Sequence, residues 1–75
     1  MQATLMSKTQ PVIGYCYDGI SVDGSARTKC QVIYRGFTEG RHIVEDKTQK
    51  TYRAERVSSD DEEPIFQFKV TDIVL

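Results

Sequence analysis

The residues best suited to binding chemistry lie in one short segment, residues 50–57, with the sequence KTYRAERV. Arginine is planar and permanently charged, and it can hold a phosphate or a carboxylate through two parallel hydrogen bonds. A β-strand alternates its side chains between two faces, so Arg53 and Glu55 are expected on one face and Tyr52 and Ala54 on the other. This segment is therefore the candidate binding surface.

Two interpretations of the segment stay open. In the first, Arg53 and Arg56 hold a phosphate while Tyr52 stacks on a base, a contact worth about 1–3 kcal/mol. In the second, the strand is solvated and Arg53 pairs with Glu55 or with the acidic loop, and such exposed pairs are worth about 0–1 kcal/mol. Arg27, Lys29 and Arg35 would extend a basic stripe if they shared that face. The candidate ligand-binding residues are Arg27, Lys50, Tyr52, Arg53, Glu55 and Arg56.

Size and composition indicate one small globular domain over residues 1–75, with 1–10 as a flexible arm. The chain has 75 residues, of which 39% are hydrophobic and 28% charged, and its net charge is -1. A chain this short buries only about 60% of its unfolded surface. With so little net charge, binding to nucleic acid would have to come from a local patch. No apolar run reaches the roughly 20 residues of a membrane helix, and no secretory signal is visible, so a cytoplasmic location without a membrane partner is expected.

The two cysteines, Cys16 and Cys30, allow two interpretations. A two-residue turn at Asp23-Gly24 would place Cys16 opposite Gln31 and Cys30 opposite Tyr17, and a small change of register would bring the sulfurs together. A disulfide is therefore one interpretation. Two reduced, buried or half-buried thiols are the favoured one, because cytoplasmic thiols stay reduced.

The chain offers little for catalysis or for a metal. Structural zinc needs four closely spaced ligands. This chain offers two isolated cysteines and one histidine, His42. One histidine supports no triad, and no glycine-rich phosphate loop is present. We therefore expect a protein that is not an enzyme and that needs no metal or cofactor.

Five short segments rich in β-forming residues predict an all-β fold with little helix: residues 12–17, 27–34, 41–46, 51–57 and 65–70. Turns are expected at Asp18-Gly19 and in a loop around Phe37, between Gly36 and Gly40. The spacing favours a small five-stranded, strongly bent antiparallel barrel of the SH3-like or Sm-like kind. Its predicted core contains Val12, Tyr15 or Cys16, Val32, Tyr34, Ile43, Tyr52, Phe66, Phe68 and Val70.

The order of these segments resembles a WYL-type domain, a bacterial and phage regulatory module built on an Sm/SH3-like barrel. The resemblance covers about residues 12–59. It rests mainly on residues 50–57, on Asp18 at the end of the first strand and on Arg27-Thr28 at the start of the second. Arg41-His42-Ile43 stands where the family has its naming Trp-Tyr-Leu, Ala54 is smaller than the usual leucine, and no helix-turn-helix is seen.

The resemblance implies a regulatory or binding module, with Arg53 and Arg56 at its site. Its ligand would be a single-stranded nucleic acid, a nucleotide-like molecule or a nucleic-acid enzyme. The alternative is a small protein-interaction module or inhibitor, phage-encoded, that docks a protein partner. Its contact would be a sheet edge, the Phe37 loop or the acidic run of residues 60–63. That run is either a solvated loop, a docking element, or a cover that folds back over the arginines.

Overall fold

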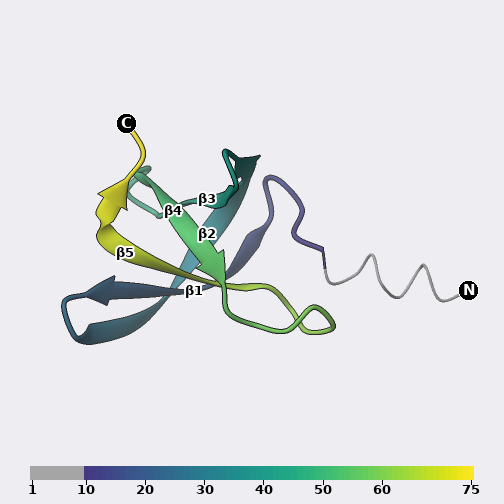
Figure 1. Ribbon diagram of the computed structural model, residues 1–75, viewed down its shortest axis with the longest axis horizontal. Coiled ribbons are helices and arrows are strands. Elements are labelled where there is room, and N and C mark those ends of the chain that lie inside the picture. Colours follow the sequence, from purple (N-terminus) through teal and green to yellow (C-terminus); the bar gives the residue numbers. More distant parts are fainter. Residues whose placement is uncertain (1–9) are drawn as a thin grey trace, which may run out of the picture.

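The computed structural model describes residues 10–75, in which five strands close into one small barrel (Figure 1). The strands are β1 (Cys16–Asp23), β2 (Ala26–Thr38), β3 (Arg41–Glu45), β4 (Thr51–Arg56) and β5 (Ile65–Ile73). No helix occurs among the described residues. The prediction of an all-β, five-stranded, strongly bent barrel of the SH3-like or Sm-like kind is therefore confirmed. The predicted arm lies, apart from Gln10, outside the described residues.

The strands follow one another around the barrel, and four of the five seams are antiparallel, as expected. The seam that closes the barrel, between β1 and β5, is parallel. This follows from the odd number of strands. Strands of a meander alternate in direction, so the first and the fifth run the same way and must pair in parallel.

The prediction that the first strand ends at Asp18-Gly19 is wrong, because β1 passes through both residues. Gly19 lies opposite Cys30 in the middle of the β1–β2 pairing. A Cβ atom at Gly19 would lie 3.1 Å from Cγ1 of Val32 and 3.3 Å from Sγ of Cys30. The glycine therefore permits close packing inside a strand.

The β1–β2 hairpin turns where a turn was predicted, but one residue later than a two-residue turn at Asp23-Gly24 would. Asp23 pairs with Ala26, so the turn residues are Gly24 and Ser25, with Gly24 at φ 63°. Glycine with positive φ at the first of two turn positions is typical of the type II′ hairpin turn.

This turn sets a register that keeps the two thiols apart. Cys16 lies opposite Ile33, and Cys30 lies opposite Gly19. Both cysteines are free, Cys16 exposed and Cys30 half-buried. The predicted pairing of Cys16 with Gln31 and of Cys30 with Tyr17 is therefore wrong.

Phe37 belongs to β2 and not to a loop, which corrects a further prediction. Gly36 has φ 125°, and the pairing of β2 with β3 shifts between Tyr34 and Gly36. This bulge lets the strand continue, with Phe37 opposite His42.

The core is formed by the inward faces of the last four strands. Five of the predicted core residues are buried: Val32, Tyr34, Tyr52, Phe66 and Phe68. Val44 and Ala54 complete the core and were not predicted. Ile43 and Val70 are only half-buried. Val12, Tyr15 and Cys16 are exposed, so these core predictions are wrong; Val12 and Tyr15 precede β1, which begins at Cys16.

Candidate functional site

The structure separates the two arginines that were expected to act together. Tyr52 and Ala54 are buried, whereas Arg53 and Glu55 line a shallow hollow of about 110 Å³ on the outer surface. Arg56 lies three residues after Arg53, so strand alternation directs the two side chains to opposite faces. Their guanidinium groups therefore do not form a common phosphate site.

Arg53 is held by a carboxylate from the neighbouring strand. Its Nη1 atom lies 2.8 Å from Oδ1 of Asp72 in β5, and Nη2 of Arg41 lies 3.9 Å from the other oxygen of the same carboxylate. All three side chains are partly exposed, so each pair contributes at most about 1 kcal/mol. Arg53 thus pairs with Asp72, and not with Glu55 or the acidic run.

Arg56 organises the loop between β4 and β5. Its guanidinium donates hydrogen bonds to the carbonyl oxygens of Ser59 (2.9 Å) and Glu62 (2.7 Å) and to the hydroxyl of Ser58 (3.3 Å). The acidic run therefore does fold over one arginine, but it binds through main-chain carbonyls. No carboxylate of residues 60–63 forms an ion pair with any residue that the structure describes.

Tyr52 has a structural role that removes it from base stacking. The residue is 5% exposed, and its hydroxyl donates a 2.9 Å hydrogen bond to Oδ2 of Asp46. Burial, followed by this bond to Asp46, raises the pKa of Tyr52.

Asp46 is the centre of the β3–β4 turn. Its Oδ1 accepts hydrogen bonds from the amide and hydroxyl of Thr48 (2.9 and 2.7 Å) and from the amide of Lys50 (3.0 Å). Burial acts to raise the pKa of Asp46, but the bonds from Thr48, Lys50 and Tyr52 outweigh it and hold the pKa below its usual value.

The remaining two candidates lie at other places in the barrel. Lys50 is exposed in the β3–β4 turn, where its main-chain amide serves the Asp46 network. Arg27 is exposed near the tip of the β1–β2 hairpin, opposite Val22. The six candidates are thus spread over the β1–β2 hairpin, the β3–β4 turn and both faces of β4.

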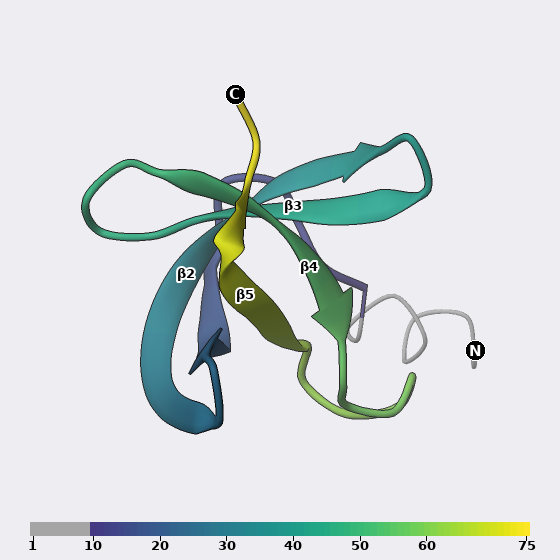
Figure 2. The same cartoon turned by 60° about the vertical axis from the view of Figure 1, so that its left-hand side comes forward.

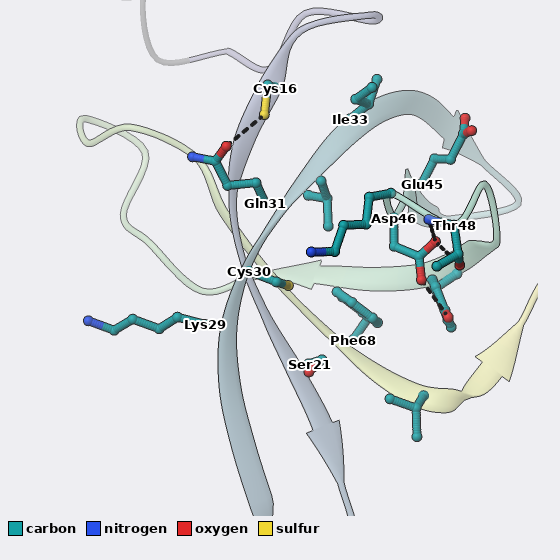
Figure 3. A pocket seen from close by; sticks show the side chains of 14 residues that line it. Cys16, Ser21, Lys29, Cys30, Gln31, Ile33, Glu45, Asp46, Thr48 and Phe68 are labelled. Carbon is teal, nitrogen blue, oxygen red and sulfur yellow. Dashed lines mark hydrogen bonds between the residues drawn. The ribbon is translucent and has the colours of Figure 1, made fainter.

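A groove of about 630 Å³ lies between the β1–β2 hairpin, the β3–β4 turn and β5 (Figure 3). Ligand pockets are commonly about 300–1,000 Å³. Figure 3 shows Cys30 and Phe68 directed into this space, with Lys29 and Gln31 on the other side of β2. The groove is lined by Cys16, Ser21, Lys29, Cys30, Gln31, Val32, Ile33, Glu45, Asp46, Lys47, Thr48, Tyr52, Phe68 and Val70.

The charges at the groove are unequally compensated. Glu45 forms an ion pair with Arg35 at 3.4 Å, and Asp46 accepts four hydrogen bonds within its own hairpin. Lys29 and Lys47 have no ion pair with any described residue. Burial raises the pKa of the Cys30 thiol, so this sulfur is a neutral part of the groove floor. The groove therefore has an apolar floor and a rim with charges of both signs, on which the two lysines have no ion pair within the described part of the chain.

The first half of β2 also forms one wall of the groove, and it has a strand on only one side. Residues 26–33 pair with β1, but β3 pairs with β2 only from Ile33 onward. Figure 2 shows β2 curving away below the β3–β4 turn, with β1 on one side of this half and no strand of residues 10–75 on the other. Residues 27–32 therefore present an open sheet edge to the groove.

The hydrogen bonds of Tyr34 show which backbone groups face outward from this edge. Its amide donates to the carbonyl of Tyr15 (2.9 Å), and its carbonyl accepts from the amide of Gly14 (2.8 Å), both on the β1 side. Backbone groups alternate in direction along a strand. The amides and carbonyls of Arg27, Lys29 and Gln31 therefore point away from β1, and among residues 10–75 no backbone group bonds them there.

No family model, curated protein or solved structure matches this chain. The WYL-type domain therefore stays a prediction. Within residues 10–75, no group of three or more His, Cys, Asp or Glu side chains is placed to hold a metal ion. No helix in the described part is long and apolar enough to cross a membrane.

Sequence reasoning missed the two features that define the groove, Asp46 and the open edge. Asp46 carried a usable signal, because Asp followed two residues later by Thr is typical of a turn closed by side-chain hydrogen bonds. The edge carried none, since it depends on how far β1 and β3 extend along β2. Of the predicted site residues, Tyr52 alone lines the groove, as part of its floor.

Proposed function

We propose that this protein is a non-enzymatic protein-interaction module that binds an extended segment of a partner as an added strand. The partner strand pairs with residues 27–31 of β2 and lies along the groove. The observation that carries this proposal is the open edge, where Arg27, Lys29 and Gln31 direct free amides and carbonyls beside an apolar hollow. Strand addition uses main-chain hydrogen bonds for affinity and pockets for alternate side chains for specificity.

The energy available from this edge fits a modest, reversible contact. Each of the three residues offers one donor and one acceptor, and each hydrogen bond contributes about 0.5–1.5 kcal/mol net. Apolar side chains that enter the groove add roughly 25 cal/mol per Å² of buried surface. Ordering the partner segment offsets part of this gain.

The groups that could serve catalysis have structural surroundings, which supports a binding role. His42 lies against the rings of Tyr34, Phe37 and Phe66, at 4.9–5.7 Å between centroids, and its Nδ1 is 3.0 Å from the hydroxyl of Tyr34. Burial, followed by the charge of Arg56, lowers the pKa of His42. This histidine is therefore a neutral member of the aromatic cluster.

Binding of a single-stranded nucleic acid or a nucleotide-like ligand is a second proposal, favoured by the cations around the groove. Lys29 and Lys47 line it, and Lys50 lies in the same turn as Lys47. On single strands, each phosphate neutralised should steepen the salt slope by about 0.7. The peptide proposal is preferred, because an added strand matches both the amides and the carbonyls of the open edge, whereas a phosphate can accept only from the amides, and Tyr52 is buried.

A proline at the open edge tests the leading proposal. In the Gln31→Pro variant, the edge loses an outward amide without losing a bond to β1, since the amide of Gln31 faces away from β1. Gln31→Ala is the matched control, because both variants lose the weak contact of the Gln31 amide oxygen with Cys16 Sγ (3.5 Å). Circular dichroism and thermal unfolding would establish that both variants fold.

The readout is affinity capture from a lysate treated with nuclease. We expect a partner that survives nuclease, is retained by Gln31→Ala and is lost by Gln31→Pro. Equal retention by both variants would refute strand addition at this edge. Partners that vanish on nuclease treatment would support the nucleic-acid proposal instead.

A further inference from the structure

We propose that the partner strand carries carboxylates on alternate residues, facing the outer surface of the barrel, and apolar side chains between them, facing the groove. This inference rests on the proposed strand addition and specifies the partner's chemistry. It depends on the different character of the two faces of β2 along the open edge.

The outer face of the edge is positive and unpaired. Arg27, Lys29 and Gln31 are exposed, and they share one face because they alternate with Cys30 and Val32, which face the barrel interior. Neither Arg27 nor Lys29 forms an ion pair with a described residue. Directly opposed side chains of antiparallel neighbours have Cβ atoms about 4.5–5.5 Å apart. Carboxylates of an added strand would therefore meet these cations.

The inner face of the edge is apolar. Cys30 and Val32 project from β2 into the groove, and Phe68 and Val70 of β5 line it from the other side. Residues of an added strand that alternate with the outward carboxylates would point into this space. The groove therefore favours apolar side chains at these positions.

The added strand would take the place that β3 leaves. β3 pairs with Ile33 through its last residue, Glu45, and the chain then turns away at Asp46. A partner strand antiparallel to β2 would extend the same row of the sheet toward the tip of the β1–β2 hairpin. Antiparallel pairing is also slightly more stable per residue than parallel pairing.

A second copy of the chain is a poor occupant of this edge. Antiparallel self-pairing centred on Lys29 would oppose the two Lys29 side chains. Centring the pairing on Thr28 would instead oppose Arg27 and Lys29 of the two copies. Like charges directly opposed across strands are destabilising. The same cations that attract an acidic strand therefore disfavour a dimer formed through β2 in these two registers.

Short peptides can test the inference directly. The probe is a fluorescent seven-residue peptide that alternates Val and Glu, and its matched control carries Gln in place of every Glu. A third peptide is the Val/Glu probe with N-methyl groups on the alternate amides that face β2. A fourth carries them on the other amides. Binding is followed by fluorescence anisotropy and by NMR of the backbone amides of Arg27, Lys29 and Gln31.

We expect the Val/Glu peptide to bind the parent protein a few-fold to about tenfold more tightly than the Val/Gln peptide, which corresponds to two partly exposed ion pairs. The Arg27→Gln/Lys29→Gln variant should abolish this difference and leave the Val/Gln affinity unchanged. N-methylation should abolish binding only when it blocks the amides that face β2.

The outcomes separate this inference from the proposed function. Equal binding of the Glu and Gln peptides, with both sensitive to N-methylation, would overturn the acidic partner and leave strand addition intact. No binding of any peptide, or binding insensitive to N-methylation, would overturn strand addition itself. An oligonucleotide that binds more tightly than the peptides and is lost in the double variant would overturn both. Concentration-dependent dimerisation lost in Gln31→Pro would assign the edge to a second copy and overturn the inference.

Discussion

Replacement of Asp46 by alanine should destabilise the barrel more than any change at an exposed cation. The carboxylate joins three parts of the β3–β4 hairpin: it accepts bonds from Thr48, from the amide of Lys50 and from the buried hydroxyl of Tyr52. Alanine removes every one of these acceptors. The expected effect is a loss of stability that is concentrated at Tyr52.

The size of the effect follows from which donors water can reach. Thr48 and Lys50 are exposed, so water replaces most of what their groups lose. Tyr52 is 5% exposed, and a buried donor left without a partner costs about 1–3 kcal/mol. With a smaller contribution from the turn, Asp46→Ala should cost about 2–3 kcal/mol. For a domain of this size, the Tm would fall by roughly 8–24 °C, at about 4–8 °C per kcal/mol.

Thermal and urea unfolding of Asp46→Ala, Tyr52→Phe and the double variant form the test. Removal of the Tyr52 hydroxyl should relieve much of the Asp46→Ala penalty, giving a coupling energy of about 1 kcal/mol or more. The pKa of Asp46 lies below its usual value of 3.8, so its contribution should be present above that pH and be lost as the pH falls through the lowered pKa. Strictly additive effects, or a loss under about 0.5 kcal/mol, would refute the reasoning.

Three further predictions concern other parts of the barrel. The lowered pKa of His42 favours its neutral form, so the stability of the folded protein should fall as the pH drops below about 6.5. Thermal unfolding at pH 7.5 and at pH 5 measures this, and the decrease in Tm between the two should be smaller in the His42→Gln variant than in the parent protein. Gly19→Ala places a methyl group about 3.1 Å from Val32 and should cost about 1–3 kcal/mol; additivity with Val32→Ala in urea unfolding would contradict this packing. Asp72→Asn breaks a partly exposed pair with Arg53 and should cost under about 1 kcal/mol, so a Tm fall above about 8 °C would be inconsistent with that exposure.

Where one side of a strand is buried, alternation predicted the fold well. Alternation assigned Val32 and Tyr34 of β2, and Phe66 and Phe68 of β5, to the inner faces of their strands. All four are core residues. These assignments need only the two-residue period of a strand and a buried side. They do not depend on which strands are neighbours.

Glycine was the main source of error in the fold. Gly19 and Gly36 were interpreted as breaks because glycine is frequent in turns, but both lie inside strands. At Gly19 the cause is close packing against Val32, and at Gly36 it is a bulge. The sequence around a glycine does not state which of these reasons applies, since each depends on a neighbouring strand.

The candidate site was harder to predict because its geometry is set by distant residues. The partner of Arg53 is Asp72, 19 residues later, and pairing of β4 with β5 brings the two together. The opposite faces of Arg53 and Arg56 could have been inferred from their spacing of three, which in a strand separates side chains to different sides. The open edge follows from the relative lengths of three strands and has no local pattern.

That edge exists because β2 is longer than either of its neighbours. It has 13 residues, against 8 in β1 and 5 in β3, and each neighbour covers mainly one half. An uncovered edge is an aggregation risk, which natural proteins reduce with charged side chains. Arg27 and Lys29 would fulfil this role against a second copy of the chain. The same charges would leave the edge open to a strand of opposite charge, so protection and selectivity would have one physical cause. The Arg27→Gln/Lys29→Gln variant should therefore lose the preference for acidic peptides and gain a tendency to self-associate. Sedimentation at increasing protein concentration would measure the self-association. A variant that loses the preference and stays monomeric would show that protection of the edge does not depend on these charges.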